Sequence, residues 1–326
     1  MKNILVSGAS GIVGYGILRS LKKTDRDLRL IGTSIYDDSA ASAFCDIFEK
    51  APNTNESGYI DWLIEIIKKY NVDFIIPGIE IDHYKWTDNA SVIKQSGAKI
   101  LLNTIELIHL CKDKWLFYEY FNQNNSSYVI ETSLDTDYDT IVNKFGLPFL
   151  LKPRIGFGGR GIVRIDSLEA FLKYKDKIGS VLLVQPIIGN ENEEYSTSAF
   201  CDGQGGVYAS MTLRRKLSRE GFTEKAEVIT AINDIDTAIS DLCRIFKPIG
   251  PTNFQFRKHN SMLKLLEINP RISSATSIRT AFGYNESEMA IDFYLEGKKP
   301  VQPKIIKGKA VRYTEDLIFY EDRNNI

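Results

Sequence analysis

The stretch LPFLLKPRIGFGGRGIV, residues 147–163, decides the fold that we expect for this chain. Its apolar run predicts a strand that ends at Lys152. The glycines that follow predict a loop with little side-chain bulk: Gly156, Gly158, Gly159 and Gly161. Backbone N–H groups in such a loop can converge on phosphate oxygens, and the lysine ammonium adds a full positive charge. A Walker P-loop places its lysine after the glycines, so this is another kind of phosphate site, or else a flexible surface hairpin.

A second polar cluster lies further along the chain, in TNFQFRKHNSMLKLLEINPR, residues 252–271. We expect two antiparallel strands with a polar turn at 258–261. The period of two places Glu267 and Asn269 on one face, and Gln255 faces the same patch from the neighbouring strand. Oxygen ligands with few charges suit Mg²⁺, which takes further ligands from nucleotide phosphates. The alternative is a solvated strand end, although an acid after an apolar run on a central strand needs a cation or donors.

The opening stretch VSGASGIVGYG, residues 6–16, resembles a dinucleotide-binding fingerprint because Gly8, Gly11 and Gly14 lie between a strand and a helix. The next predicted strand, LRLIGTS, ends in Thr33 and Ser34 instead of the acid that would hold ribose hydroxyls. We therefore interpret the loop as architecture or as one wall of a substrate pocket. A reductase that binds NAD(P) there is kept as an alternative.

The order of predicted elements indicates a mixed fold, α/β followed by α+β. In the first hundred residues, continuous apolar strands alternate with helices, which is typical of a parallel sheet covered on both faces. We expect one helix over 104–123, with Thr104 as its N-cap. Short strands surround the glycine cluster, and antiparallel strands follow at 197–202, 205–215 and 225–232, before a helix at 234–246.

Composition excludes several classes of function. The chain of 326 residues has 41 Lys and Arg against 42 Asp and Glu, so it has no global basic field that would attract nucleic acid or anionic lipid. Cysteines 45, 111, 201 and 243 lack CxxC spacing, which is typical of reduced thiols. The start MKNILVSG predicts a strand instead of a leader, and no apolar run approaches the ~20 residues that span a bilayer. We expect a cytoplasmic protein.

Five motifs in a fixed order resemble the ATP-grasp enzymes, in particular a single ATP-grasp unit like that of carbamoyl phosphate synthase. They are DKWLF (113–117), LPFLLKPRIGFGGRG (147–161), VQPIIGNENEEY (184–195), NFQF (253–256) and LEINPR (266–271). The resemblance implies a Rossmann-like pre-ATP-grasp domain over 1–103. A two-lobed ATP-grasp fold would follow, with the small lobe and its glycine-rich loop over 104–184 and the large lobe with the metal site over 185–326.

The resemblance also implies a role for each matching residue. Lys114 and Lys152 would contact the phosphates of ATP, and Gly156 to Gly161 would form a mobile loop over them. Gln185 and Ile187 would bind the adenine edge, and Glu194 the ribose hydroxyls. The expected ligands of Mg²⁺, or Mn²⁺, are Gln255, Glu267 and Asn269. Arg271 would meet the γ-phosphate or an acyl-phosphate.

The reaction implied is the ATP-dependent joining of a carboxylate to an amine through an acyl-phosphate. Glu80 or Asp82 would lie near the acceptor, and we expect Arg214, or its neighbour Arg215, to pair with a substrate carboxylate. Ser274 stands where the synthases have a second arginine, which argues against bicarbonate as the substrate. Amino acids and sugar acids both stay open, and a homodimer is expected. The alternatives are the NAD(P)-dependent oxidoreductase and a catalytically silent ATP-binding module.

Overall fold

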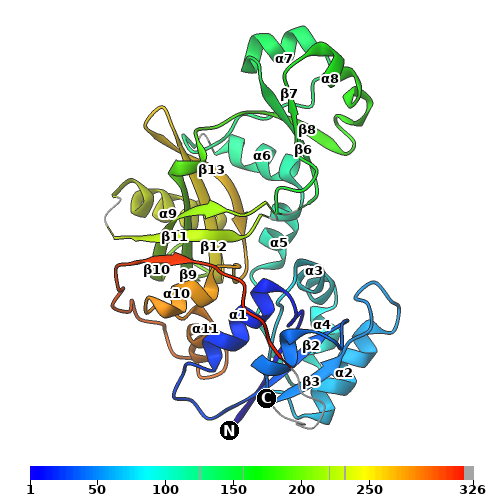
Figure 1. The fold of residues 1–326 in the computed structure, drawn as a ribbon, viewed down its shortest axis with the longest axis vertical. Coiled ribbons are helices and arrows are strands. Elements are labelled where there is room, and N and C mark those ends of the chain that lie inside the picture. The colour runs from blue at the N-terminus through cyan, green and yellow to red at the C-terminus, as the bar shows by residue number, and fades with distance from the viewer. Residues whose placement is uncertain (125, 157, 220, 231–232, 319–326) are drawn as a thin grey trace.

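The computed structural model describes residues 1–124, 126–156, 158–219, 221–230 and 233–318, which form three sheets arranged along the long axis of the molecule (Figure 1). The N-terminal sheet is at one end, a large antiparallel sheet lies in the middle, and a small three-stranded sheet is at the other end. No helix of the described residues is long and apolar enough to cross a membrane.

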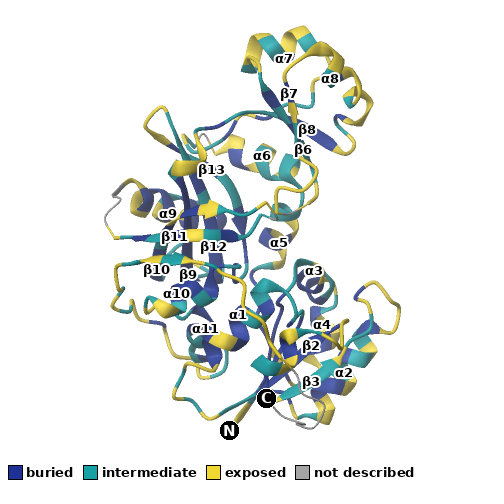
Figure 2. Ribbon diagram, viewed as in Figure 1, coloured by how far each residue is buried: buried dark blue, intermediate teal, exposed yellow. Residues whose placement is uncertain are grey.

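The N-terminal sheet is parallel, as predicted, with strand order β3-β2-β1-β4-β5. Its strands are β1 (Lys2–Val6), β2 (Leu28–Ser34), β3 (Ile47–Lys50), β4 (Phe74–Ile76) and β5 (Lys99–Ile100). Alternate residues of β1 face opposite sides. Ile4 and Val6 join a core with α1 (Ile12–Leu21), whereas Leu5 packs with α2 (Tyr59–Lys69), α3 (Glu80–Asp88) and α4 (Ala90–Lys94). Both faces of the sheet are therefore covered, and Figure 2 shows its central strands coloured as buried.

The small sheet is built around the quoted apolar strand. β6 (Phe149–Pro153) pairs antiparallel with β7 (Val163–Ile165) on one side and with β8 (Leu182–Pro186) on the other. Helices α7 (Tyr138–Phe145) and α8 (Leu168–Leu172) cover it, and Phe149 and Phe171 lie in a core that this lobe makes for itself. Lys152 is thus held near the end of a central strand.

The middle sheet is antiparallel throughout, in the order β13-β12-β9-β10-β11-β14. Its strands are β9 (Glu194–Asp202), β10 (Val207–Leu217), β11 (Thr223–Ile229), β12 (Ile249–His259), β13 (Met262–Asn269) and β14 (Lys309–Val311). Helices α9 (Asn233–Phe246), α10 (Thr276–Ala281) and α11 (Glu286–Tyr294) pack on it. The turn between β12 and β13 is at Asn260 and Ser261, which both have positive φ, so the predicted hairpin is confirmed.

The single helix expected over 104–123 is wrong. The structure has α5 (Ile105–Lys112) and α6 (Lys114–Gln123), because the carboxylate of Asp113 accepts from the backbone of Trp115 and Leu116 and caps a second helix. The cap expected at Thr104 is confirmed, since its hydroxyl accepts from the backbone N of Leu107. Strand β3 and helix α3 were not anticipated.

A buried ion pair stands under the middle sheet. The side chains of Arg279 on α10 and Glu286 on α11 are both fully buried, with 3.7 Å between Nη1 and Oε1. Arg279 also donates to Ser273 Oγ at 2.5 Å and to Asn253 Oδ1 at 2.9 Å, and Ser198 donates to Glu286. The pair therefore fixes α10 and α11 to strands β9 and β12.

We predict that Arg279→Met lowers the free energy of unfolding by about 3–5 kcal/mol, because the Glu286 charge loses its partner. The double variant Arg279→Met/Glu286→Leu should recover much of this loss, since it removes both buried charges. Urea unfolding of the two single variants and the double variant measures the coupling. Strictly additive losses would contradict the assignment of a coupled ion pair.

Candidate functional site

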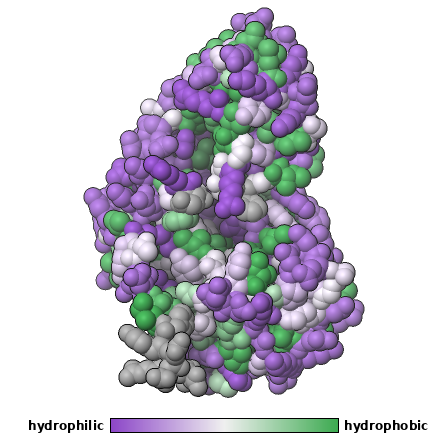
Figure 3. All heavy atoms as spheres, turned by 45° about the vertical axis from the view of Figure 1, so that its right-hand side comes forward, coloured by the Kyte–Doolittle hydropathy of each residue, from purple (hydrophilic) through white to green (hydrophobic). Residues whose placement is uncertain are grey.

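A cavity of about 630 Å³ lies between the small sheet and the middle sheet and extends to α1 and α3. Figure 3 shows the molecule hollowed between the small lobe and the body below it. Residues of the small lobe, the middle sheet and α3 line the cavity, and so do residues at the start of α1 and in α6. Most of the predicted site residues line it: Lys114, Lys152, Gly156, Gly158, Gly159, Gln185, Glu194, Gln255, Glu267, Asn269 and Arg271.

Lys114 is brought to the cavity by the helix break described above. It is the first residue of α6, where its backbone N donates to Arg154 O at 2.9 Å. Arg154 in turn forms an ion pair with Asp113, with Nη2 and Oδ2 2.7 Å apart. The ammonium of Lys114 donates to Gly156 O at 2.7 Å, which connects it to the glycine loop.

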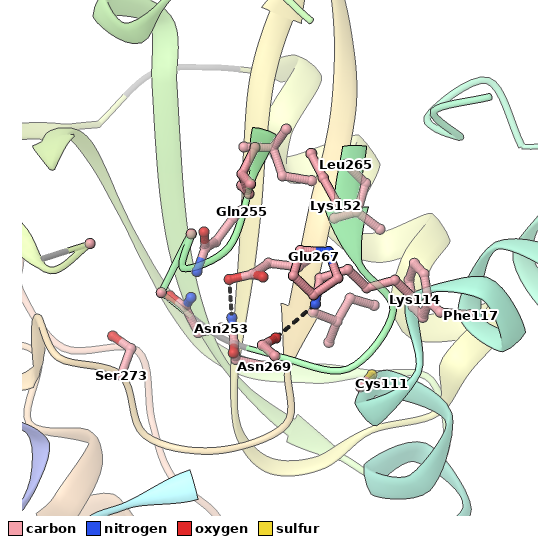
Figure 4. A pocket seen from close by; sticks show the side chains of 18 of the residues that line it. Cys111, Lys114, Phe117, Lys152, Asn253, Gln255, Leu265, Glu267, Asn269 and Ser273 are labelled. Carbon is pink, nitrogen blue, oxygen red and sulfur yellow. Dashed lines mark hydrogen bonds between the residues drawn. The ribbon is translucent and has the colours of Figure 1, made fainter. Parts of the chain in front are cut away.

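Lys152 faces the same space from β6, and Figure 4 shows it directed with Lys114 toward Glu267. Burial, opposed by Glu267 and aided by the nearby Lys114 cation, lowers the pKa of Lys152 to about 8. Burial also lowers the pKa of Lys114. Two cations held out of water favour a polyanion that could compensate their lost hydration.

The glycine loop closes against a turn of the middle sheet. A Cβ built on Gly221 would lie 2.3 Å from Gly158 O, so the backbones of the two segments touch. Both residues have positive φ, and so have Gly159 and Gly161. Gly161 does not line the cavity among the described residues. The loop thus covers one side of the space in front of Lys152.

One end of the cavity is apolar with a polar edge. Phe117, Phe121 and Leu265 contribute to its walls, together with Pro186 and Ile188. Gln185 Nε2 donates to Thr132 Oγ1 at 2.8 Å. Ile187 is not among the lining residues, although both its neighbours are. A flat base of a nucleotide suits such an apolar slot between two lobes.

The predicted metal ligands lie together on β12 and β13. Gln255 is the register partner of Glu267, and Asn269 Nδ2 donates to Glu267 Oε1 at 2.9 Å (Figure 4). One carboxylate and a neighbouring amide fit Mg²⁺, which keeps several waters and binds through one or two carboxylates plus phosphate oxygens. The described residues contain no cluster of three or more His, Cys, Asp or Glu side chains that could hold a metal ion.

Glu194 is fully engaged by arginines. Its Oε1 accepts from Arg215 Nε at 3.0 Å, and its Oε2 accepts from Arg257 Nε at 2.9 Å. Arg214 is not brought to the cavity. It lies on the outer face of β10, where it is half-exposed and forms an ion pair with Glu227. Of the two arginines expected near the substrate, the structure therefore brings in Arg215.

Arg271 meets α3 at the far end of the cavity. Its Nε donates to Glu80 Oε2 at 2.7 Å, and Tyr84 donates to Glu80 Oε1 at 2.8 Å. Burial opposes ionisation of Glu80, but Arg271 lowers its pKa below the ordinary value. Asp82, the other acid considered, is buried against Thr54 and does not line the cavity. Burial lowers the pKa of neighbouring His83 to about 4, so this side chain is neutral.

The glycines of the opening stretch serve close packing. A Cβ on Gly14 would lie 2.3 Å from Gly8 O, and one on Gly78 would lie 2.1 Å from Ser7 O. Ile12 and Val13, at the start of α1, line the far end of the cavity. The loop is thus one wall of the same cavity, and its glycines are required by contacts inside the protein.

Sequence reasoning missed several lining residues. Asn253 and Arg257 lie on the same face of β12 as Gln255, so the period of two could have found them. Tyr84 and His83 could not have been found that way, because α3 was not anticipated. Among the described lining residues, six are cationic and three anionic, which leaves an excess of positive charge: Lys114, Lys152, Arg160, Arg215, Arg257 and Arg271 against Glu80, Glu194 and Glu267.

Comparisons with known sequences agree with this geometry. A family model described as "ATP-grasp in the biosynthetic pathway with Ter operon" matches residues 180–317. The large chain of carbamoyl phosphate synthase from Thermoanaerobacter pseudethanolicus is 25% identical over 221 residues, which are 63% of this chain and 20% of that protein. The large chain of carbamoyl phosphate synthase from Methanothrix thermoacetophila is 24% identical over 261 residues, which are 72% of this chain and 24% of that protein. This chain therefore matches about a quarter or less of the length of these relatives.

Solved structures share the fold along almost the whole chain. N5-carboxyaminoimidazole synthetase from Staphylococcus aureus, complexed with ADP, has a TM-score of 0.72 at 18% identity and covers 94% of this chain and 80% of its own. The biotin carboxylase domain dimer of 2-oxoglutarate carboxylase from Hydrogenobacter thermophilus, with MgADP and bicarbonate, has a TM-score of 0.71 at 16% identity. The match covers 94% of this chain and 73% of that chain. L-amino acid ligase from Bacillus licheniformis has a TM-score of 0.65 at 14% identity, and the match covers 91% of this chain and 74% of that chain.

Fold and sequence lead to the same assignment. The N-terminal parallel sheet and the two antiparallel sheets fit the fold of the solved neighbours. The sequence is also similar to that of the synthase large chains. The chain therefore has the two-lobed ATP-grasp fold behind a parallel N-terminal sheet, and its sequence is similar to that of the large chains of carbamoyl phosphate synthase.

Proposed function

We propose that this protein is an ATP-dependent ligase that activates a carboxylate as an acyl-phosphate and joins it to an amine, with release of ADP and phosphate. One observation carries the proposal: Lys114 and Lys152 of one lobe and Glu267 and Asn269 of the other converge on one cavity. This arrangement supports binding of a triphosphate between fixed cations and a divalent ion. The solved neighbours with ADP or MgADP support the same choice of nucleotide.

The first step requires an anion to attack an anion. A substrate carboxylate oxygen bonds to the γ-phosphorus, and the bond to the bridging oxygen of ADP breaks. Lys114, Lys152 and Arg271 would screen the oxygens and hold the two groups in line, which is most of what a protein contributes to phosphoryl transfer. Mg²⁺ or Mn²⁺ held by Glu267 and Asn269 would supply further positive charge to the phosphates.

The second step forms the product. The amine nitrogen bonds to the acyl carbon, the C–O bond to phosphate breaks with its electron pair going to phosphate, and the leaving phosphate takes up the proton that the amine loses. Glu80 lines the far end of the cavity and is the acid we assign to the amine side. Water must be excluded meanwhile, because an acyl-phosphate hydrolyses easily, and the glycine loop against Gly221 is placed to do this.

Smaller parts of the proposal follow from the sequence. Gln185 and the backbone around Ile187 would bind the adenine, and Glu194 the ribose. We propose residues 1–103, 104–184 and 185–326 as the three domains, a homodimer as the oligomeric state, and the cytoplasm as the location. The substrates are a small carboxylate and an amine, with amino acids and sugar acids as the first classes to examine.

The reaction is tested by measuring ADP release with MgATP against a matrix of carboxylates and amines, followed by the mass of any condensed product. The proposal expects ADP release that depends on both substrates. ATP that binds without turnover with every pair would contradict it and would favour a silent binding module.

We predict that Lys152→Ala and Glu267→Gln each reduce this ADP release by roughly 100- to 1,000-fold, because each removes a charge that acts on the transferring phosphoryl group. The thermal unfolding midpoint should change little in comparison. Lys173→Ala is the matched control, because Lys173 is an exposed lysine of the same lobe that pairs with Glu169. A Lys152→Ala protein with ordinary phosphate release would contradict the role assigned to Lys152 in phosphoryl transfer.

We predict that Gly221→Ala uncouples the reaction, because its Cβ would push Gly158 away and leave the cavity open to water. The ratio of ADP released to condensed product should rise. Gly146→Ala is the control for backbone strain, since Gly146 also has positive φ but no atom lies within 4 Å of its added Cβ. Equal ratios in the two variants would show that the contact with Gly158 has no role in closure.

A further inference from the structure

Arg215 is a buried cation at the wall of the cavity. Strand β10 turns Arg214 outward, to a side-chain exposure of 47%, and the next residue inward, where the exposure of Arg215 is 6%. Arg215 lines the cavity together with Gln255 and Glu267. A charged side chain buried to this degree needs partners of opposite charge.

The partners of Arg215 compensate its charge only in part. Its Nη2 lies 2.9 Å from Glu194 Oε1. The other oxygen of this carboxylate is taken by Arg257, whose Nη2 lies 2.8 Å away. Two guanidinium groups therefore share one carboxylate, and this side of the cavity keeps an unbalanced positive charge. The bonds of Arg215 use Nε and Nη2, so Nη1 is not committed to either partner.

The second partner of Arg215 is the amide of Gln255. Nη2 of Arg215 donates to Gln255 Oε1 at 2.5 Å. This oxygen is the atom with which Gln255 would bind a metal ion, because the amide nitrogen has no lone pair for a cation. A divalent ion on the same oxygen would lie beside a fixed guanidinium in a poorly hydrated site, where like charges repel strongly.

We propose that Arg215 is a built-in cation of the phosphate-binding site. It contacts the triphosphate directly and takes the place at Gln255 that a metal ion would otherwise occupy. A single divalent cation then binds per chain, at Glu267 and Asn269, and Gln255 orients Arg215 instead of binding metal. This inference rests on the proposed function, because it assigns a role within the same nucleotide site.

The planar guanidinium suits this role. It presents several N–H donors to phosphate oxygens in a fixed fork and stays charged at any physiological pH. Glu194 and Gln255 fix its orientation in advance, so little side-chain entropy is lost when the nucleotide binds. Arg215 can bind phosphate oxygens in the absence of a metal ion, whereas the carboxylate of Glu267 needs a metal ion to do so.

The first experiment measures nucleotide affinity without metal. Isothermal titration of ADP in excess EDTA should show that Arg215→Met weakens binding roughly 10- to 100-fold, as expected for loss of a charge-assisted contact. Arg214→Met is the matched control from the adjacent position and should stay within about 2-fold. Arg215→Lys, which keeps the charge, should lie between the two. Thermal unfolding shows that each variant is folded.

The second experiment counts metal ions. Titration of Mn²⁺ into the ADP complex, followed by electron paramagnetic resonance, should give one tightly bound ion per chain. Gln255→Met should leave the count and affinity unchanged, whereas Glu267→Gln should abolish tight binding. Loss of Mn²⁺ in Gln255→Met, two tight ions in the wild type, or unchanged ADP affinity in Arg215→Met would each overturn this inference alone. A wild-type protein that binds no nucleotide under any condition would overturn the proposed function as well.

Discussion

Charges that face one another across the cavity between the lobes determine what this site can bind. Lys114 and Lys152 lie on one side and Glu267 on the other, and burial makes each cation costly until an anion arrives. The folding of each lobe brings these groups to the cleft. Asp113 ends one helix and caps the next so that Lys114 comes first, β6 carries Lys152, and the β12–β13 hairpin carries Glu267. The excess of cations among the described lining residues makes a polyanion the ligand that this site favours.

A second layer of buried polar groups supports this cavity from below. Arg279 donates to Asn253 and to Ser273, two residues that line the cavity, and it pairs with Glu286 beneath them. The same helices, α10 and α11, pack against α1 of the N-terminal domain. The far end of the cavity, where α1 and α3 contribute its walls, is therefore connected through α10 and α11 to the sheet that carries the metal ligands. A substrate bound there would contact all of these elements.

Much of the site could be predicted because it lies on regular strands. The period of two along KLLEINP was enough to bring Glu267 and Asn269 together, and the strand before the glycine loop predicted Lys152 near its end. The same rule states that only one of Arg214 and Arg215 can face inward, but it cannot state which one, because the choice depends on the pairing of β10 with β9 and β11. Helix α3 was missed because its residues lack an apolar stripe, since it is held by burial of Trp86 and by polar contacts with distant residues. The break at Asp113 is stabilised by Arg154, which is far away in the sequence.

We expect one cavity to hold the nucleotide, its metal ion and the far-end substrate, and the N-terminal glycine turn to hold no phosphate. A crystal structure with Mg²⁺ and a non-hydrolysable ATP analogue tests this most directly. We expect phosphate oxygens in hydrogen-bond contact with the ammonium groups of Lys114 and Lys152, and a metal ion on Glu267. A nucleotide whose phosphates lie on the Gly8 to Gly14 turn, with Lys152 untouched, would contradict it.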